Sequence, residues 1–169
     1  MTATQPTLAD VRRFHELHDT NPDPVTLPRV TREFVLAGDA IFTVETPDHQ
    51  HYTYRVEYQP AGERWPQAWF VKILIGPDNG SDYSYLGKLD DFTGQAKTTA
   101  KSAMPADAFP VRLFNRILAR IWGNDHAAFE QFGYRVHHEG KCGRCARRLT
   151  TPESVTLGFG PECAKLLGY

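Results

Sequence analysis

The sequence predicts an α+β protein in which a four- to five-stranded antiparallel sheet packs on one main helix, followed by a C-terminal zinc-knuckle and helix module. Two observations predict the first part. Segments with strand-like patterns follow one another between residues 33 and 89, and a strong apolar stripe at helical spacing follows over 110–122. The third observation is that all three cysteines of the 169-residue chain lie after residue 141.

Composition divides the chain into three predicted segments, 1–32, 33–133 and 134–169. The first has apolar residues at helical spacing over 8–18 and then a linker rich in proline and asparagine. We therefore expect a loosely attached N-terminal helix. The second segment should hold the sheet and the main helix, and the third the metal-binding module.

The sheet is predicted from strands at 40–46, 51–58, 68–75 and 81–89, with 33–37 as a fifth. Alternation is clearest in 51–58, where tyrosine and valine occupy one face and polar residues the other. Turn signals rich in Pro, Gly, Asn and Asp separate the strands. The small, polar segment 93–106 should form a loop.

The main helix should begin near Asp107, which can cap it, with Pro110 in its first turn, where a missing N–H is tolerated. We expect its apolar stripe to pack on the sheet face that includes Phe70 or Ile73. A shorter helix over 126–132 and a strand over 134–138 should follow. The stripe consists of Leu113, Phe114, Ile117, Leu118 and Ile121.

Composition also excludes several classes of protein. A hydrophobic share of 41% suffices for a core and excludes a disordered chain, and no apolar run approaches the roughly 20 residues that cross a bilayer. The N-terminus has no apolar stretch typical of a secretory signal. We therefore expect a cytoplasmic protein with no membrane partner.

The C-terminal cysteines have the spacing of a structural zinc site. Cys142 and Cys145 form a C-x-x-C knuckle, and Cys163 follows a Gly-Pro-x helix start, where the helix dipole favours a thiolate. One Zn²⁺ ion needs a fourth ligand, which we predict to be His138; His137, beside it, is the alternative. In an extended segment these two histidines point to opposite sides, so only one can reach the metal.

The cysteine spacing allows three other interpretations. Free buried thiols and a redox C-x-x-C are disfavoured, the latter because no thioredoxin-like βαβ pattern surrounds it. A catalytic zinc would need an open position and a base such as Glu139 or Glu162. Thiolate-rich sites quench Lewis acidity, and the H-x-E…P-C-x-x-C order of zinc deaminases is absent from the sequence, so the structural site is favoured.

The segment 138–163 resembles a domain-of-unknown-function family of actinobacteria and their phages. That family's pattern is HEGxCGRCGRxLTxPESIxxGxGPxC, from which Ala146 departs. The resemblance implies a zinc-binding module and no particular reaction; a phage-encoded protein would act in the host cytoplasm. The matching residues include His138, Cys142, Cys145, Leu149, Thr150, Pro152, Ser154, Gly158, Gly160, Pro161 and Cys163.

Charge is unevenly distributed, although the net charge is only −1. Residues 1–111 carry 10 Lys and Arg against 15 Asp and Glu, whereas 112–148 carry 8 against 3. If the basic groups of this second stretch adjoin, they form one positive surface suited to phosphates; otherwise they are solvated or pair with the acidic sheet. Seven of these eight basic residues fall into two groups, with Arg112, Arg116 and Arg120 on the main helix, and Lys141, Arg144, Arg147 and Arg148 around the knuckle.

The strands also carry many aromatic residues. Exposed aromatics on a sheet can stack bases, but one face must pack on the main helix, and the negative charge of the region argues against a groove for phosphates. These residues are Tyr52, Tyr54, Tyr58, Trp69, Phe70, Tyr83 and Tyr85.

Three functions follow from these patterns. The first is a non-enzymatic zinc-binding protein that binds nucleic acid, with contacts from Arg144, Arg147, Arg148, Lys141, Arg116 and Arg120. The second is a protein-interaction factor, such as a phage-encoded modulator or inhibitor of a host or defence protein. A metal-dependent enzyme ranks third, because no acid–base pair or complete triad emerges from the sequence.

Overall fold

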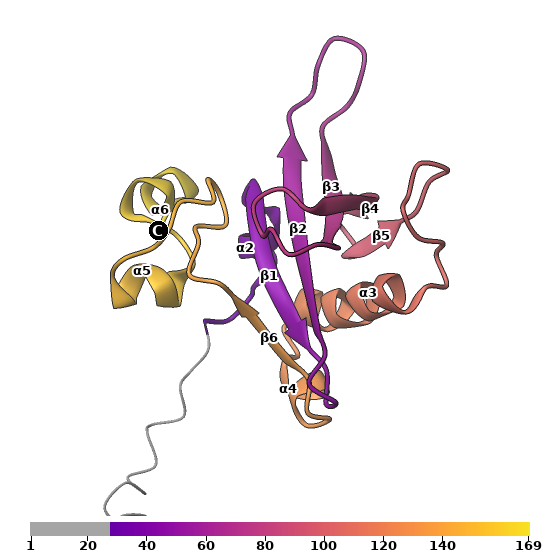
Figure 1. Ribbon diagram of the computed structural model, residues 1–169. Coiled ribbons are helices and arrows are strands. Elements are labelled where there is room, and N and C mark those ends of the chain that lie inside the picture. The colour runs from indigo at the N-terminus through magenta and orange to yellow at the C-terminus, as the bar shows by residue number, and fades with distance from the viewer. Residues whose placement is uncertain (1–27) are drawn as a thin grey trace, which may run out of the picture.

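The computed structural model describes residues 28–169; the helix predicted over 8–18 lies outside them. The described chain is α+β, as predicted, with a six-stranded antiparallel sheet that is larger than expected. Its spatial order is β5-β4-β3-β2-β1-β6 (Figure 1). The strands are β1 (Asp39–Glu45), β2 (His51–Gln59), β3 (Ala68–Leu74), β4 (Tyr83–Asp90), β5 (Gln95–Lys97) and β6 (Arg135–His138).

The sheet is strongly coiled, and β4 crosses β2 at a steep angle in Figure 1. A register shift between Val71 and Lys72, where β3 pairs with β4, contributes to this shape, because a bulge increases local twist. Close by, a Cβ at Gly87 would lie 2.4 Å from the carbonyl oxygen of Lys97. Only glycine at this position lets β5 approach β4.

Helix α3 (Phe109–Trp122) buries its apolar stripe against the sheet, as predicted. Ala108, and not Asp107, is its N-cap residue, with no side-chain cap. Strand β2 is fixed to the helix start, because the Tyr54 hydroxyl donates to the carbonyl of Pro110 at 2.8 Å. On β3, Ile73 is buried in this core, whereas Phe70 has the opposite strand parity and lies on the other face.

Residues 33–37, considered as a fifth strand, instead belong to a short helix, α2 (Arg32–Leu36). Thr31 caps it by accepting from the backbone N–H of Phe34 at 3.2 Å, and Phe34 and Val35 are buried. The capping threonine outweighs the β propensity of a five-residue segment. Trp69 of β3 donates its indole N–H to the carbonyl of Leu36, which holds α2 on the sheet.

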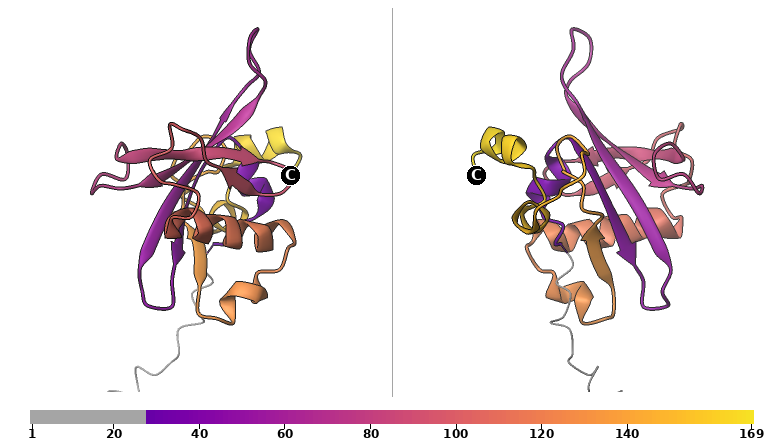
Figure 2. Two further views of the ribbon diagram at one scale, coloured as in Figure 1. Left: turned by 90° about the vertical axis from the view of Figure 1, so that its right-hand side faces the viewer. Right: turned by 60° about the vertical axis from the view of Figure 1, so that its left-hand side comes forward.

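The remaining elements lie near the two ends of the sheet. The segment 93–106 is not all loop, because it contains β5, whose Ala96 N–H donates to the Asn115 side chain of α3 at 2.7 Å. Short helix α4 (Ala127–Glu130) precedes β6. Helices α5 (Pro152–Leu157) and α6 (Pro161–Leu167) lie beyond β1 and β6, away from α3 (Figures 1 and 2). Among the described residues no helix combines the length and apolarity that crossing a membrane requires.

Candidate metal centre

The C-x-x-C segment folds as a small hairpin directly after β6. Lys141 and Arg148 form an antiparallel bridge, and the N–H of Cys142 donates to the carbonyl of Arg147 at 2.8 Å. The turn closes when the N–H of Ala146 donates to the carbonyl of Cys142, with Ala146 at φ 56°. This geometry holds both cysteine side chains on the same side of the hairpin end.

Gly143, between the two cysteines, packs against α2. A Cβ on this glycine would lie 2.7 Å from the Phe34 ring and 2.8 Å from the Phe34 carbonyl oxygen. The Gly143 carbonyl accepts from the N–H of Asp39, which begins β1. The knuckle is thus anchored to the sheet through α2 and β1. Nothing in the sequence pairs Gly143 with Phe34, so this contact depends on the tertiary structure alone.

Cys163 is the third residue of α6 and is buried. Gly158, at φ 83°, ends α5, and its carbonyl accepts from the N–H of Gly143. Pro161 then starts α6, as the sequence predicts. The chain between the knuckle and α6 therefore folds back so that Cys163 meets the hairpin.

The three cysteine sulfurs lie within 4.8 Å of one another. The Sγ atoms of Cys145 and Cys163 are 3.7 Å apart. Four ligands at the zinc–sulfur bond length of about 2.3 Å lie about 3.8 Å from one another in a tetrahedron. The separation of Cys145 and Cys163 matches this value, and the three sulfurs together could hold a metal ion.

The electrostatics of the cluster also fit a cation. Burial acts to raise the pKa of the Cys142 thiol, but backbone N–H groups of Gly160, Arg144 and Cys145 lower it overall. Burial raises the pKa of the Cys163 thiol, the neighbouring cysteine side chains raise it further, and only Arg144 opposes them. Three thiolates this close repel one another, so a bound divalent ion is what would let all three ionise.

His138 lies outside this group of three sulfurs. Its buried ring stacks on Phe34 with centroids 4.8 Å apart, and its Nδ1 accepts from the N–H of Gly140 at 3.2 Å. Burial lowers the pKa of His138, although the backbone of Val155 opposes this. A neutral ring whose Nδ1 accepts carries its proton on Nε2, and a protonated nitrogen has no lone pair for a metal. Metal binding through Nε2 would require the Gly140 contact to break.

His137 lies on the other face of β6, opposite Thr43 of β1. Burial lowers its pKa, and its Nδ1 is buried with no hydrogen-bond partner among residues 28–169. The strand alternation that the sequence predicts for the two histidines is therefore observed. Of the two, His138 is the one that faces Gly158 of the module, because its Nε2 lies 3.7 Å from where a Cβ on Gly158 would stand.

The two predicted basic groups lie on separate parts of the molecule. Arg144, Arg147 and Arg148 are exposed around the knuckle, with Lys141 half-buried beside them. Arg116 and Arg120 instead line a cavity of about 480 Å³ between α3 and α4, together with Phe132 and Tyr134. Figure 1 shows α3 apart from α5 and α6, so the two groups lie on different parts of the molecule.

Fold and site together define an α+β protein with a candidate three-cysteine metal centre at its C-terminus. Residues 135–168 match a protein family described as a family of unknown function, DUF6011. The match spans β6, the knuckle, α5 and α6, and leaves β1 to β5 and α3 outside it. Comparison with curated proteins and with solved structures finds no match.

Proposed function

We propose that this protein is a non-enzymatic binding protein whose C-terminal module is held together by one structural Zn²⁺ ion. The observation that carries the proposal is the cluster of three cysteine sulfurs at tetrahedral spacing. Cys142, Cys145 and Cys163 would hold the ion as thiolates. The ion would cross-link the knuckle to α6 and neutralise the thiolates, which is the role of a structural zinc.

His138 is proposed as the fourth ligand, with its Nε2 freed by loss of the Gly140 contact. Its support is that Nε2 is buried and faces the module. Elemental analysis of the purified protein should find one zinc per chain, and a protein without stoichiometric metal contradicts the site. Replacement of zinc by Co²⁺ gives a spectrum that reports the ligands. His138→Ala should change this spectrum and His137→Ala should not; the reverse result assigns the ligand to His137.

We propose nucleic acid as the partner of the module. Arg144, Arg147 and Arg148 are exposed around the knuckle, and none of them forms an ion pair within residues 28–169. A metal-held turn fixes its flanking side chains, so less entropy is lost when they contact phosphate. Lys141 lies in the same hairpin. Arg116 and Arg120 would form a separate contact, since they lie on α3.

Salt-dependent binding to duplex DNA tests this partner. Each phosphate contact adds about 0.9 to the slope of log affinity against log salt, so Arg147→Ala with Arg148→Ala should lower the slope by roughly 2. Arg64→Ala with Arg112→Ala removes the same charge far from the module and should not lower it. Zinc content should stay unchanged in both. Failure of the wild type to bind any oligonucleotide at about 50 mM salt refutes the proposal, because electrostatic binding is strongest there.

A protein partner is the second candidate, because the module exposes several large apolar side chains. Leu157 is 41% exposed, Leu166 69% and Tyr169 57%. Exposed apolar groups that cluster often mark protein interfaces. A pull-down from host lysate in which Leu166→Ser abolishes capture, with Arg147→Ala and Arg148→Ala as controls, would favour this function over nucleic-acid binding.

A further inference from the structure

A groove on the sheet face opposite α3 combines aromatic rings with lysines. Its volume is about 670 Å³. We propose that this groove binds single-stranded nucleic acid, with bases stacked on the rings and phosphates held by the lysines. This site is separate from the metal module and does not depend on it. The lining residues are Glu57 of β2, Phe70 and Lys72 of β3, Tyr85 and Lys88 of β4, and Thr99, Ala100 and Lys101 after β5.

The floor of the groove offers two half-buried rings. Phe70 and Tyr85 lie on neighbouring strands with centroids 6.1 Å apart and planes inclined at 57°. The two rings pack against each other, and both remain partly exposed to solvent. Bases of single strands stack on such side chains, at about 1–3 kcal/mol per base. Of the other aromatics of the sheet, Tyr52, Tyr54 and Trp69 contact α3 or α2 instead.

The charge of the groove is positive, although the surrounding sequence is acidic. Lys72 is neutralised by Glu57 at 2.5 Å, and Glu57 also contacts Arg55. Lys88 and Lys101 form no ion pair within the described residues, and Lys88 Nζ lies 5.8 Å from the Phe70 ring centroid. Two lysines without ion-pair partners in the described chain, beside aromatic rings, are complementary to a nucleic acid, which carries both phosphate charges and aromatic bases. This surface is therefore positively charged, although the net charge of residues 1–111 is negative.

The rim that carries Lys101 is an ordered turn. The N–H of Ser102 donates to the carbonyl of Thr99, the N–H of Thr99 donates to the Ser102 hydroxyl, and the N–H of Lys101 donates to the Thr99 hydroxyl. The N–H of Ala103 donates to the carbonyl of Tyr85, which ties this turn to β4 beside the ring. Lys101 and Lys88 thus lie on different elements that border the groove.

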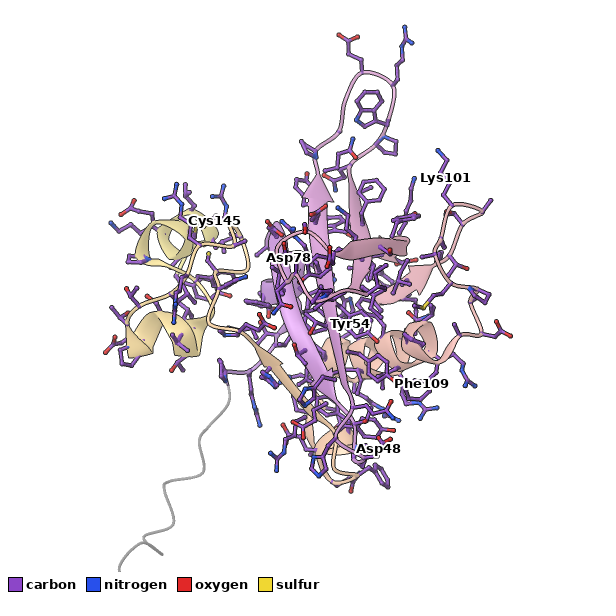
Figure 3. All side chains as sticks on the ribbon, in the orientation of Figure 1. Asp48, Tyr54, Asp78, Lys101, Phe109 and Cys145 are labelled. Carbon is purple, nitrogen blue, oxygen red and sulfur yellow. The ribbon has the colours of Figure 1, made fainter. Side chains whose placement is uncertain are left out.

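A single strand fits these features better than a duplex or a free nucleotide. Bases in a duplex are already stacked and cannot reach the rings. A free nucleotide has one base and needs only one ring and one cation, whereas this groove offers two of each. Figure 3 shows Lys101 on the opposite side of the sheet from Cys145, so the groove and the metal centre can be tested separately.

Fluorescence anisotropy with an oligothymidylate of about 12 nucleotides tests the proposal, since sites of this kind span about 4–16 nucleotides. Phe70→Leu keeps apolar volume and removes the ring; it should weaken binding roughly 5- to 150-fold. Phe92→Leu removes a ring that is 84% exposed elsewhere and should have no effect. Amide exchange of each variant should match the wild type.

Replacing Lys88 and Lys101 together by Gln should lower the salt slope by roughly 1.4, at about 0.7 per contact on a single strand. Lys165→Gln, on α6 of the metal module, is the control and should leave the salt slope unchanged. Three results would overturn the groove proposal. Phe92→Leu would weaken oligothymidylate binding as much as Phe70→Leu does, thymidine monophosphate at the same nucleotide concentration would compete as well as the oligonucleotide, or the wild type would not bind at about 50 mM salt. Duplex binding that depends on Arg147 and Arg148 would survive all three outcomes.

Discussion

The sheet with α3 and the C-terminal module are stabilised by different means. Helix α3 alone buries six apolar residues against the sheet. Helix α5 buries none, and apart from cysteines the segment 139–169 buries only three apolar side chains, those of Leu149, Phe159 and Ala164. Burial of one such side chain contributes about 1.5–3 kcal/mol at most. A segment this poor in apolar burial needs a cross-link, which the proposed metal ion on the three cysteines would provide.

The largest expected effect breaks the module and spares the sheet. Cys163→Ser should lose the metal and unfold residues 139–169, because structural zinc contributes about 10–16 kcal/mol in finger peptides, more than this segment can replace. Zinc analysis and amide hydrogen exchange measure it. Protection should vanish after residue 139 and persist in β1 to β4. Thr156→Ala, exposed on α5, should change neither. If a metal-free variant keeps its amide protection throughout the chain, the module does not depend on a metal and the two regions do not differ in what stabilises them.

The next effect breaks the sheet region and spares the metal centre. Ile117 is 1% exposed at the centre of the α3 stripe. Ile117→Ala should lower the free energy of unfolding by roughly 2–5 kcal/mol, from lost burial plus a cavity. Chemical denaturation measures it, with exposed Arg112→Ala as the control, expected within about 0.5 kcal/mol of wild type. Zinc content should remain one per chain. A loss below about 1 kcal/mol would mean that the stripe does not stabilise the core.

A third variant tests the joint between the two regions. Gly143→Ala places a methyl group against the Phe34 ring and carbonyl, and overpacking of this kind costs about 1–3 kcal/mol. Because the knuckle must shift, zinc affinity measured by competition with a chelator should also fall. Gly160→Ala is the matched control, since its nearest neighbour, Leu149, lies 3.8 Å away. If both variants bind zinc equally well, the α2 contact does not position the knuckle.

The smallest expected effect concerns one hydrogen bond between β2 and α3. Burial raises the pKa of Tyr54, so its hydroxyl stays neutral and donates to Pro110. Tyr54→Phe should lower the free energy of unfolding by about 1 kcal/mol. Tyr58→Phe removes a hydroxyl that donates to exposed Gln67 and should be neutral by thermal unfolding. If both variants lower the stability equally, burial of the Tyr54 hydrogen bond does not increase its contribution to the free energy of unfolding.

Much of the fold was predictable because it depends on local periodicity. The strands at 51–58 and 68–75, the main helix and the strand before the cysteines all follow from alternation or helical spacing. Helix α2 and strand β5 were missed, because both are short and depend on partners far along the chain. Thr31 caps α2, but Trp69 and Leu36 hold it in place, and Asn115 of α3 completes β5.

By itself the sequence determined which residues could bind a metal, because thiol chemistry and the C-x-x-C and Gly-Pro-x-Cys spacings are local properties of the chain. Only the tertiary structure decided that Cys163 meets Cys145, that His138 stacks on Phe34 outside the group of sulfurs, and that the basic groups on α3 and the knuckle are separate. It also decided which aromatics face α3 and which line a lysine-bordered groove. These outcomes depend on how distant segments pack, and net charge or spacing along one chain carries no information about that packing.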